Sequence, residues 1–304
     1  MTDNKSPILV FGATGQQGGS VVTALLELGW PVRALVRNPA STKAQSLRDA
    51  GVEVRHGSFE DKASLKEAMS GVHGVFSVQP SSPGGTVTDE EEVSYGVAVA
   101  DIAVECDVKH LVYSSGGAVR EEPSGVAHFD TKSEIEKHIC TLPIKSTIVR
   151  PVTFMELLTM PGFGLNERRF NFFMKPEQTM QVIAVEDIGR IVAAVFDDFD
   201  KYAGQTFEIA GDTISGHDLE KFFTAAARRA IPYSRFSDEL LASNPFLRKL
   251  TAMMDDGRLA GSADLSLMSQ LNPRLQTFEA WLKDKGRSSF ERALASSNAW
   301  DYDK

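Results

Sequence analysis

A glycine-rich stretch near residue 12 is the clearest candidate for chemistry in this sequence. Gly12, Gly15 and Gly18 directly follow the apolar run 8–11, and an amphipathic helical pattern starts at once after them. Without Cβ atoms, such a turn lets the backbone approach a phosphate, and the helix N-terminus offers unpaired N–H groups and a favourable dipole. A strand, a glycine turn and a helix in this order are the fingerprint of a dinucleotide pyrophosphate site. The alternative is an ordinary glycine-rich turn that holds no ligand.

The whole turn is expected to contact the pyrophosphate of a nicotinamide dinucleotide. The predicted contacts are Gly12, Ala13, Thr14, Gly15, Gln16, Gln17 and Gly18.

The end of the second predicted strand distinguishes between the two nicotinamide dinucleotides. An acidic residue there would accept hydrogen bonds from the adenosine ribose, whereas this chain has Arg37, a cation suited to a 2′-phosphate. Ser41, Thr42 and Lys43 offer further donors to the same phosphate. The sequence therefore favours NADP(H) over NAD(H). The alternative is that Arg37 is a solvated arginine at the end of a strand.

Composition and charge narrow the class of partner. The 304 residues are 42% hydrophobic and 24% charged, which is typical of globular proteins. The formal net charge of -9, with no basic run, disfavours direct binding of nucleic acid or of an anionic membrane. We therefore expect a small-molecule dinucleotide and a regulatory protein as partners, and the sequence leaves open whether the chain forms a homodimer.

Targeting signals and cysteines indicate the compartment. No stretch approaches the ~20 apolar residues of a membrane span, and the first strand follows a short polar lead without an apolar signal region. Cys106 and Cys140 lie far apart without metal-type spacing, which indicates reduced thiols and no metal site. We therefore expect a cytoplasmic protein.

The first half of the chain alternates strand and helix patterns, which predicts an α/β fold with a Rossmann-type doubly wound parallel sheet. The expected strands are 7–13, 31–37, 52–58, 72–79, 110–116 and 145–151, and the helices between them include 20–29, 44–51, 64–71 and a long stretch that ends at Cys106.

Beyond residue 151 the pattern changes, and prolines and glycines make 151–180 loop-rich. We expect a dinucleotide-binding Rossmann domain over 1–152 and a smaller, mainly helical C-terminal lobe over 153–304. A strand and a helix are predicted within 179–196 and another strand within 205–211, so the region 180–210 is expected to return to the main sheet.

Five stretches together resemble the NmrA-like family of atypical short-chain dehydrogenase/reductases, and the resemblance spans nearly the whole chain. They are VFGATGQQGGSV, ALVRNP, AHFDTKSEIEKHI, VIAVEDIGRIVAAV and LNPRLQTFEAWL. The glycine motif is shared by many dehydrogenases, whereas HFDTKSEIE and LNPRLQTFEAWL are much more specific. Family members include NADP(H)-binding redox sensors, transcription co-regulators and NADPH-dependent reductases of quinones and dyes, so the resemblance implies NADP(H) binding and leaves turnover open.

The resemblance also implies contacts outside the glycine turn. Residues that follow the third strand would border the adenine, residues after the fourth would line the cofactor near its ribose, and a third group would border the nicotinamide. In that order they are Ser58 and Phe59; Gln79 and Pro80; and Thr153, Phe154, Met155 and Glu156. Sensor-type relatives often carry an acidic residue in place of Ser58 and a lysine near Ser94. For Phe59 the alternative is plain packing.

Two residues are candidates for catalysis. Short-chain dehydrogenases place a tyrosine and a lysine four residues apart; here Lys132 is present, and His128 stands in the position of the tyrosine. The resemblance implies that Lys132 contacts the cofactor, the alternative being a lysine on a helix surface. His128 could donate a proton near neutral pH, but the pattern favours a structural role for it, ahead of a helix start with Asp130 or Thr131 near the N-cap.

Two functions follow from these residues. The first is a redox-sensing or regulatory NADP(H)-binding protein, which the missing tyrosine favours. The alternative is an NADPH-dependent reductase of a quinone, aldehyde or similar apolar acceptor. Ser114 and Ser115 lie where a dehydrogenase serine sits, or else they are hydroxyls that end a strand before the turn at Gly116 and Gly117. An aromatic segment would then enclose the acceptor, or else form the core of the smaller lobe. Its members are Phe163, Phe170, Phe172, Phe173 and Met174.

Overall fold

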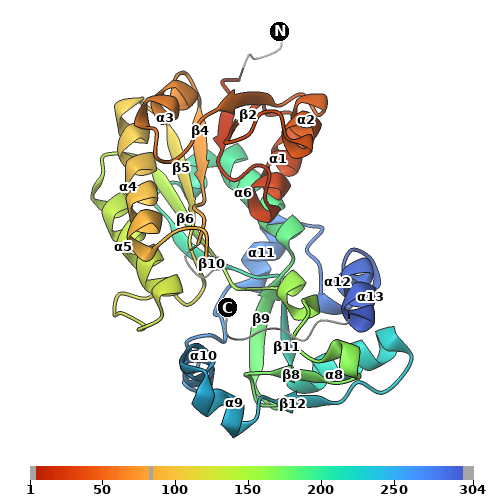
Figure 1. Cartoon of the computed structure of the whole chain (residues 1–304). Coiled ribbons are helices and arrows are strands. Elements are labelled where there is room, and N and C mark those ends of the chain that lie inside the picture. Colours follow the sequence, from red (N-terminus) through yellow and green to blue (C-terminus); the bar gives the residue numbers. More distant parts are fainter. Residues whose placement is uncertain (1–4, 82–84, 297–304) are drawn as a thin grey trace. The chain divides into compact units, whose positions relative to one another are not determined.

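A computed structural model of the chain describes residues 5–81 and 85–296 (Figure 1). The chain divides into two compact units. Unit 1 comprises Met1–Arg150 and Glu186–Phe207, and unit 2 comprises Pro151–Val185 and Glu208–Lys304. The chain therefore passes from one unit to the other three times.

Unit 1 is built on a seven-stranded parallel sheet within the described residues, in the order β10-β6-β5-β4-β1-β2-β3. Its strands are β1 (Ile8–Val10), β2 (Val32–Val36), β3 (Glu53–His56), β4 (Gly74–Ser77), β5 (His110–Ser114), β6 (Ser146–Pro151) and β10 (Thr206–Ile209). The inner strand β1 is fully buried and pairs in parallel with β2 on one side and β4 on the other. The strand order reverses between β1 and β4, and the carboxyl ends of strands at such a switch point are where open α/β sheets bind ligands.

Helices cover both faces of this sheet, which confirms the predicted Rossmann-type class. Figure 1 shows α3, α4 and α5 on one face and α1, α2 and α6 on the other. The helices are α1 (Gln16–Glu27), α2 (Thr42–Asp49), α3 (Lys62–Met69), α4 (Asp89–Glu105), α5 (Ala127–Thr141), α6 (Val185–Asp197) and the short α7 (Phe199–Tyr202). Side-chain caps set several of their starts: Ser41 caps α2, Asp61 caps α3, and Thr88 forms a capping box with Glu91 on α4.

Unit 2 contains two small sheets and most of the C-terminal helices. Strands β7 (Thr153–Phe154), β9 (Thr179–Ile183) and β11 (Asp212–Ser215) form one sheet, and β8 (Phe170–Phe172) pairs with β12 (Tyr233–Arg235) in the other. The helices are α8 (Gly216–Ala227), α9 (Asp238–Ser243), α10 (Pro245–Asp255), α11 (Leu265–Leu271), α12 (Phe278–Lys283) and α13 (Arg287–Ala295), with 3-10 turns at Met155–Thr159 and Leu165–Glu167.

The expectation for region 180–210 needs one correction. Most of α6 and the first half of β10 belong to unit 1, but β9 pairs with β7 and β11 in unit 2 and not with the main sheet. The reason is a tight return after β10: the Gly211 N–H donates to the Val182 carbonyl at 2.7 Å, which aligns β11 antiparallel to β9.

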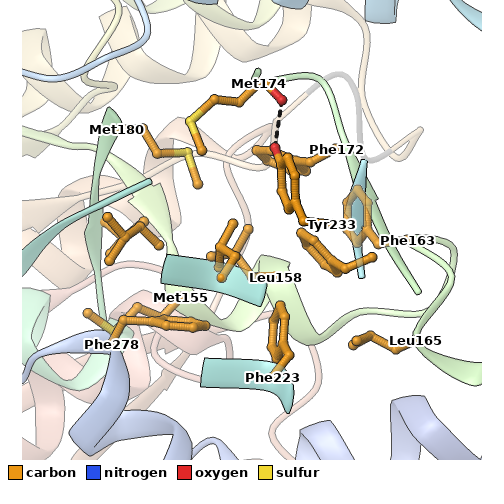
Figure 2. Close-up of a cluster of buried hydrophobic side chains, with 14 of the residues drawn as sticks. Met155, Leu158, Phe163, Leu165, Phe172, Met174, Met180, Phe223, Tyr233 and Phe278 are labelled. Atoms are coloured by element: carbon orange, nitrogen blue, oxygen red, sulfur yellow. Dashed lines mark hydrogen bonds between the residues drawn. The ribbon is translucent and has the colours of Figure 1, made fainter. Parts of the chain in front are cut away.

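The aromatic segment predicted either to enclose an acceptor or to form a core does form a core. Phe163, Phe170, Phe172, Phe173 and Met174 are all buried within one apolar cluster of unit 2. Figure 2 shows this cluster, in which the Tyr233 hydroxyl donates to the Met174 carbonyl at 2.6 Å. Rings packed on one another in this way contribute to the stability of unit 2.

A glycine allows α6 to approach α1 closely within unit 1. A Cβ atom added to Gly189 would overlap both the side-chain and the backbone oxygens of Ser20, and the Ser20 hydroxyl donates to the Glu186 carbonyl at 3.3 Å. The helix α1 follows the glycine turn directly. The contact of α6 with α1 therefore helps to hold the turn in place.

We therefore expect Gly189→Ala to destabilise the protein. Overlap with the Ser20 backbone should destabilise the protein by about 1–3 kcal/mol, which exceeds the stabilisation that alanine gives a helix relative to glycine. Urea unfolding measures the change, and an unchanged midpoint would contradict the close crossing.

A buried histidine at the start of β5 makes stability depend on pH. The His110 side chain is 0% exposed, and its Nε2 lies 2.8 Å from Thr147 Oγ1. The Thr147 hydroxyl donates its own proton to the Tyr202 carbonyl at 2.8 Å, so it must accept from His110 Nε2–H. His110 Nδ1 then has no partner among the described residues, and burial, with the charges of His73 and Lys145, lowers the pKa of His110 from 6.5 to about 3.

Acidification should therefore weaken the fold through His110. Below pH 6.5 His110 binds a proton in the unfolded chain, whereas in the native state it stays neutral down to about pH 3. The free energy of unfolding should therefore fall by about 1.4 kcal/mol for each pH unit of acidification in this range. Urea titrations between pH 7 and 4 on the wild type and on His110→Gln test this. The variant should lose this part of the slope, and equal slopes would refute it.

Candidate functional site

The glycine turn has the geometry that a phosphate site requires. Gly12 has a φ of +65°, and the Gly15 N–H donates to the Gly12 carbonyl at 2.8 Å. A Cβ atom on Gly18 would overlap the Gly12 carbonyl group. Gly12 is thus required by its backbone conformation and Gly18 by the close approach of α1 to the turn.

The N-terminus of α1 is open toward a ligand. Gly15 is the N-cap, and no side chain in the described part of the chain caps this helix. The first-turn N–H groups of a 12-residue helix, together with its dipole, favour an anion at this place.

Two cations lie at the turn and at the neighbouring strand end. Lys43, on α2, donates from Nζ to the Thr14 carbonyl at 3.0 Å, and Arg37 is exposed immediately after β2. Of the other predicted donors, Ser41 already bonds the Asn38 carbonyl at 2.9 Å and caps α2. The cationic part of the predicted 2′-phosphate site is therefore Arg37 and Lys43.

After β3, the predicted adenine-side residues meet an acidic group that the sequence reasoning missed. Hydrogen bonds from the hydroxyls of Ser58 and Tyr95 lower the pKa of Glu60, and Tyr95 donates to it at 2.8 Å. The ring of Phe59 stacks on Phe11 and on Tyr95, each at 5.3 Å between centroids. Phe59 thus packs against the core, and Glu60 adds an acidic charge beside Ser58.

The carboxyl ends of β4 and β5 carry buried polar atoms that have no partner among residues 5–81 and 85–296. Gln79 donates from Nε2 to Ser77 Oγ at 2.9 Å, while its Oε1 is buried with no partner in the described residues. Ser114 donates to Gln17 Oε1 at 2.7 Å and so ties β5 to α1, whereas the buried Ser115 hydroxyl has no partner there either. Pro80 is half-buried beside Gln79. Unmatched buried groups of this kind fit a site that receives hydrogen bonds from a ligand.

The helix that carries the catalytic candidates starts earlier than predicted. It begins at Ala127 after Val126, so His128 lies inside the helix rather than ahead of it, and Asp130 is in the first turn without capping the helix. Asp130 instead accepts hydrogen bonds from the backbone N–H groups of Ser124 and Gly125, which stabilises the preceding turn. Capping side chains look alike in sequence whether they bond forward or backward.

His128 therefore lies inside the first turn of α5. Its Nδ1 is 2.9 Å from the Ser81 hydroxyl, and burial together with the charge of Lys132 lowers its pKa to about 3. At neutral pH the imidazole is uncharged, so it is a poor proton donor.

Lys132 is buried rather than on a helix surface. It is 8% exposed, and its Nζ lies 2.7 Å from Glu92 Oε1 on α4. Burial lowers the pKa of Lys132 more than the attraction of Glu92 raises it. Its stem lies near Gly116, where an added Cβ would be 3.6 Å from Lys132 Cδ. Lys132 thus belongs to the carboxyl end of β5, with Glu92 as a partner that no local sequence pattern revealed.

The four predicted nicotinamide neighbours fall in unit 2. Thr153 and Phe154 form β7, opposite Val182 and Ile183 of β9. Met155 is fully buried in the core of unit 2, and the Glu156 carboxylate accepts from the Val185 N–H at 3.1 Å, at the start of α6. Each residue has a contact within its own unit.

Other classes of site receive no support from the described residues. Within 5–81 and 85–296, no three His, Cys, Asp or Glu side chains gather in a way that would hold a metal ion. In the same residues no helix has both the length and the apolar character needed to cross a bilayer.

A family model, described as the NmrA-like family, matches residues 4–280. The chain belongs to the NmrA-like family. It is 29% identical to the NAD(P)H azoreductase of Xenophilus azovorans, over 74% of this chain and 76% of that protein.

Solved structures of similar fold include both reductases and a regulator. The Citrobacter triphenylmethane reductase in complex with NADP(H) matches at a TM-score of 0.76 and 21% identity, over 95% of this chain and 100% of that one. NmrA, a negative transcriptional regulator, matches in complex with NAD at 0.79 and 18% identity, over 99% of both chains, and has also been solved with NADP. The neighbours thus share the Rossmann-like fold and bind NAD or NADP.

Proposed function

We propose that this NmrA-like protein binds NADP(H) in preference to NAD(H). The observation that carries the proposal is the uncapped N-terminus of α1 over the glycine turn, with Lys43 on the Thr14 carbonyl and Arg37 at the end of β2. The helix end suits the pyrophosphate, and the two cations suit a 2′-phosphate, which carries more charge than the hydroxyl of NAD.

The remaining predicted contacts complete this proposal. The Gln79 Oε1 atom, buried without a partner in the described chain, suits a ribose hydroxyl, and Lys132 offers an ammonium at the end of β5. Ser58 and Phe59 would border the adenine, with Glu60 beside them. Thr153 to Glu156 remain the proposed neighbours of the nicotinamide.

We further propose that the protein is a reductase of acceptors that need no protein acid. Bound NADPH supplies a hydride. Because His128 is neutral at pH 7, it offers no imidazolium to protonate a carbonyl oxygen. A cationic dye takes up a hydride without any proton, and a quinone reduced by a hydride becomes a hydroquinone anion that water can protonate. The names of the azoreductase and the triphenylmethane reductase support this class of acceptor.

A regulatory role is the second candidate function. A neutral histidine in the place of the dehydrogenase tyrosine favours it, as does the likeness to the transcriptional regulator NmrA. Such a role requires a partner that binds the NADPH and NADP forms with different affinities. The net charge of -9 favours a protein partner over nucleic acid.

Arg37→Ala should weaken NADPH binding by about tenfold to a hundredfold and leave NADH binding nearly unchanged, because only NADPH carries the 2′-phosphate. Fluorescence titration measures both dissociation constants. Arg48→Ala is the control: it removes an arginine of α2 whose guanidinium bonds the Pro39 carbonyl. Equal NADPH affinity in Arg37→Ala and wild type would reject the proposed 2′-phosphate site.

NADPH oxidation should be fast with quinones and cationic dyes and slow with aldehydes. His128→Asn should keep turnover within about threefold, because a neutral imidazole does not act as a general acid. A hundredfold or greater loss of turnover in this variant would show that His128 is the proton donor. No turnover on the whole panel, with NADPH-dependent partner binding, would favour the regulator.

A further inference from the structure

The ion pair between α4 and α5 is buried more deeply than almost any other charge pair in unit 1. Glu92 is 1% exposed, and its Oε1 lies 2.7 Å from Lys132 Nζ. The two helices come close because Gly96, one turn beyond Glu92, has no side chain: a Cβ there would lie 2.6 Å from Ile135 Cδ1.

Stability alone does not account for such a pair. Removing both charges from water costs several kcal/mol per ion, and well-packed apolar residues often serve equally well or better. Leu65, Val99 and Ile135 show that this part of unit 1 has an apolar core. A buried ammonium and carboxylate in such surroundings call for a second reason.

The position of the ammonium supplies that reason. The stem of Lys132 lies beside Gly116, directly after Ser115, whose buried hydroxyl has no partner in the described residues. Ser114 in turn bonds Gln17 of the glycine turn at 2.7 Å. A lysine ammonium has three N–H donors, and Glu92 takes one of them, which leaves two for a ligand at this edge of the sheet.

We propose that Glu92 is the positioning residue of Lys132: it holds the ammonium charged and in one orientation at the end of β5, with two N–H donors directed to the ribose of the dinucleotide. The proposal rests on the proposed function. In this proposal α4 takes part in dinucleotide binding, a role that no motif of the sequence indicates.

A second buried ion pair on α5 provides a matched control. Glu136, one turn beyond Lys132, pairs with Arg150 of β6 and is 6% exposed. Its Oε1 accepts from Arg150 Nε at 3.0 Å. Glu92→Gln and Glu136→Gln therefore remove the same charge from the same kind of environment, but only the first alters the partner of Lys132.

Both variants should lose similar thermal stability, but only Glu92→Gln should bind NADPH more weakly, by about tenfold or more. NADPH affinity should fall as rising pH deprotonates Lys132. In Glu92→Gln this fall should occur at a lower pH than in wild type, because the carboxylate charge that keeps Lys132 protonated is gone. Equal NADPH affinity and equal pH profiles in Glu92→Gln and Glu136→Gln would overturn the proposal. If Glu92→Gln does not fold, Glu92→Asp keeps the charge on a shorter stem, and its affinity loss should be smaller than that of Lys132→Met.

A double variant separates pairing from ligand contact. Lys132→Met removes the ammonium beside the buried Glu92 carboxylate, so it should be less stable than Glu92→Gln with Lys132→Met, in which both charges are gone. The double variant should regain stability but not NADPH affinity. Recovery of wild-type affinity would show that Lys132 only neutralises Glu92, and would overturn the proposal.

A measurement on the cofactor-free protein distinguishes failure of this inference from failure of NADP(H) binding. NMR titration of lysine labelled at the ε carbon, with the Lys132 signal assigned by its loss in Lys132→Met, follows the pKa of Lys132 directly. The pKa should drop in Glu92→Gln and stay unchanged in Glu136→Gln. An unchanged pKa in Glu92→Gln refutes the role of Glu92 even if the wild type binds no dinucleotide at all.

Discussion

The contact between Gly18 of α1 and the Gly12 carbonyl is the constraint on which the site in unit 1 depends. Any side chain at position 18 would overlap that carbonyl, so α1 keeps its close approach to β1 only with glycine there. Three further features lie at this turn: the N-terminus of α1, the Lys43 ammonium on the Thr14 carbonyl, and the hydrogen bond between Ser114 and Gln17. Gly189 of α6 supports the same helix from its other side.

Around this turn, the groups suited to binding a dinucleotide are different from the groups that could transfer a proton. Arg37 and Lys43 lie where we propose that a dinucleotide presents its phosphates, and polar atoms without partners in the described residues lie at the ends of β4 and β5. The groups that resemble a dehydrogenase's acid–base machinery are instead engaged: His128 is kept neutral and bonded to Ser81, and Lys132 is held by Glu92. A site of this kind is better equipped to hold a dinucleotide than to protonate a substrate, which suits acceptors that need only a hydride.

The sequence determined by itself whatever depends on local order along the chain. The alternation of strand and helix predicted the Rossmann-type sheet, and the spacing of Gly12, Gly15 and Gly18 directly after a strand predicted the turn. The family followed from stretches such as HFDTKSEIE and LNPRLQTFEAWL, and the family model confirms it. Each of these follows from the order of residues along the chain and not from which distant side chains pack together.

Only the tertiary structure decided what depends on partners from distant elements. It paired β9 with β11 instead of the main sheet, made a core of the aromatic segment 163–174, and started α5 at Ala127 because Asp130 bonds backward. It also brought Glu92 to Lys132 across 40 residues of chain. A sequence pattern shows which face of a helix is apolar, but a buried charge is defined by the group opposite it, and the packing of α4 on α5 alone selects that group.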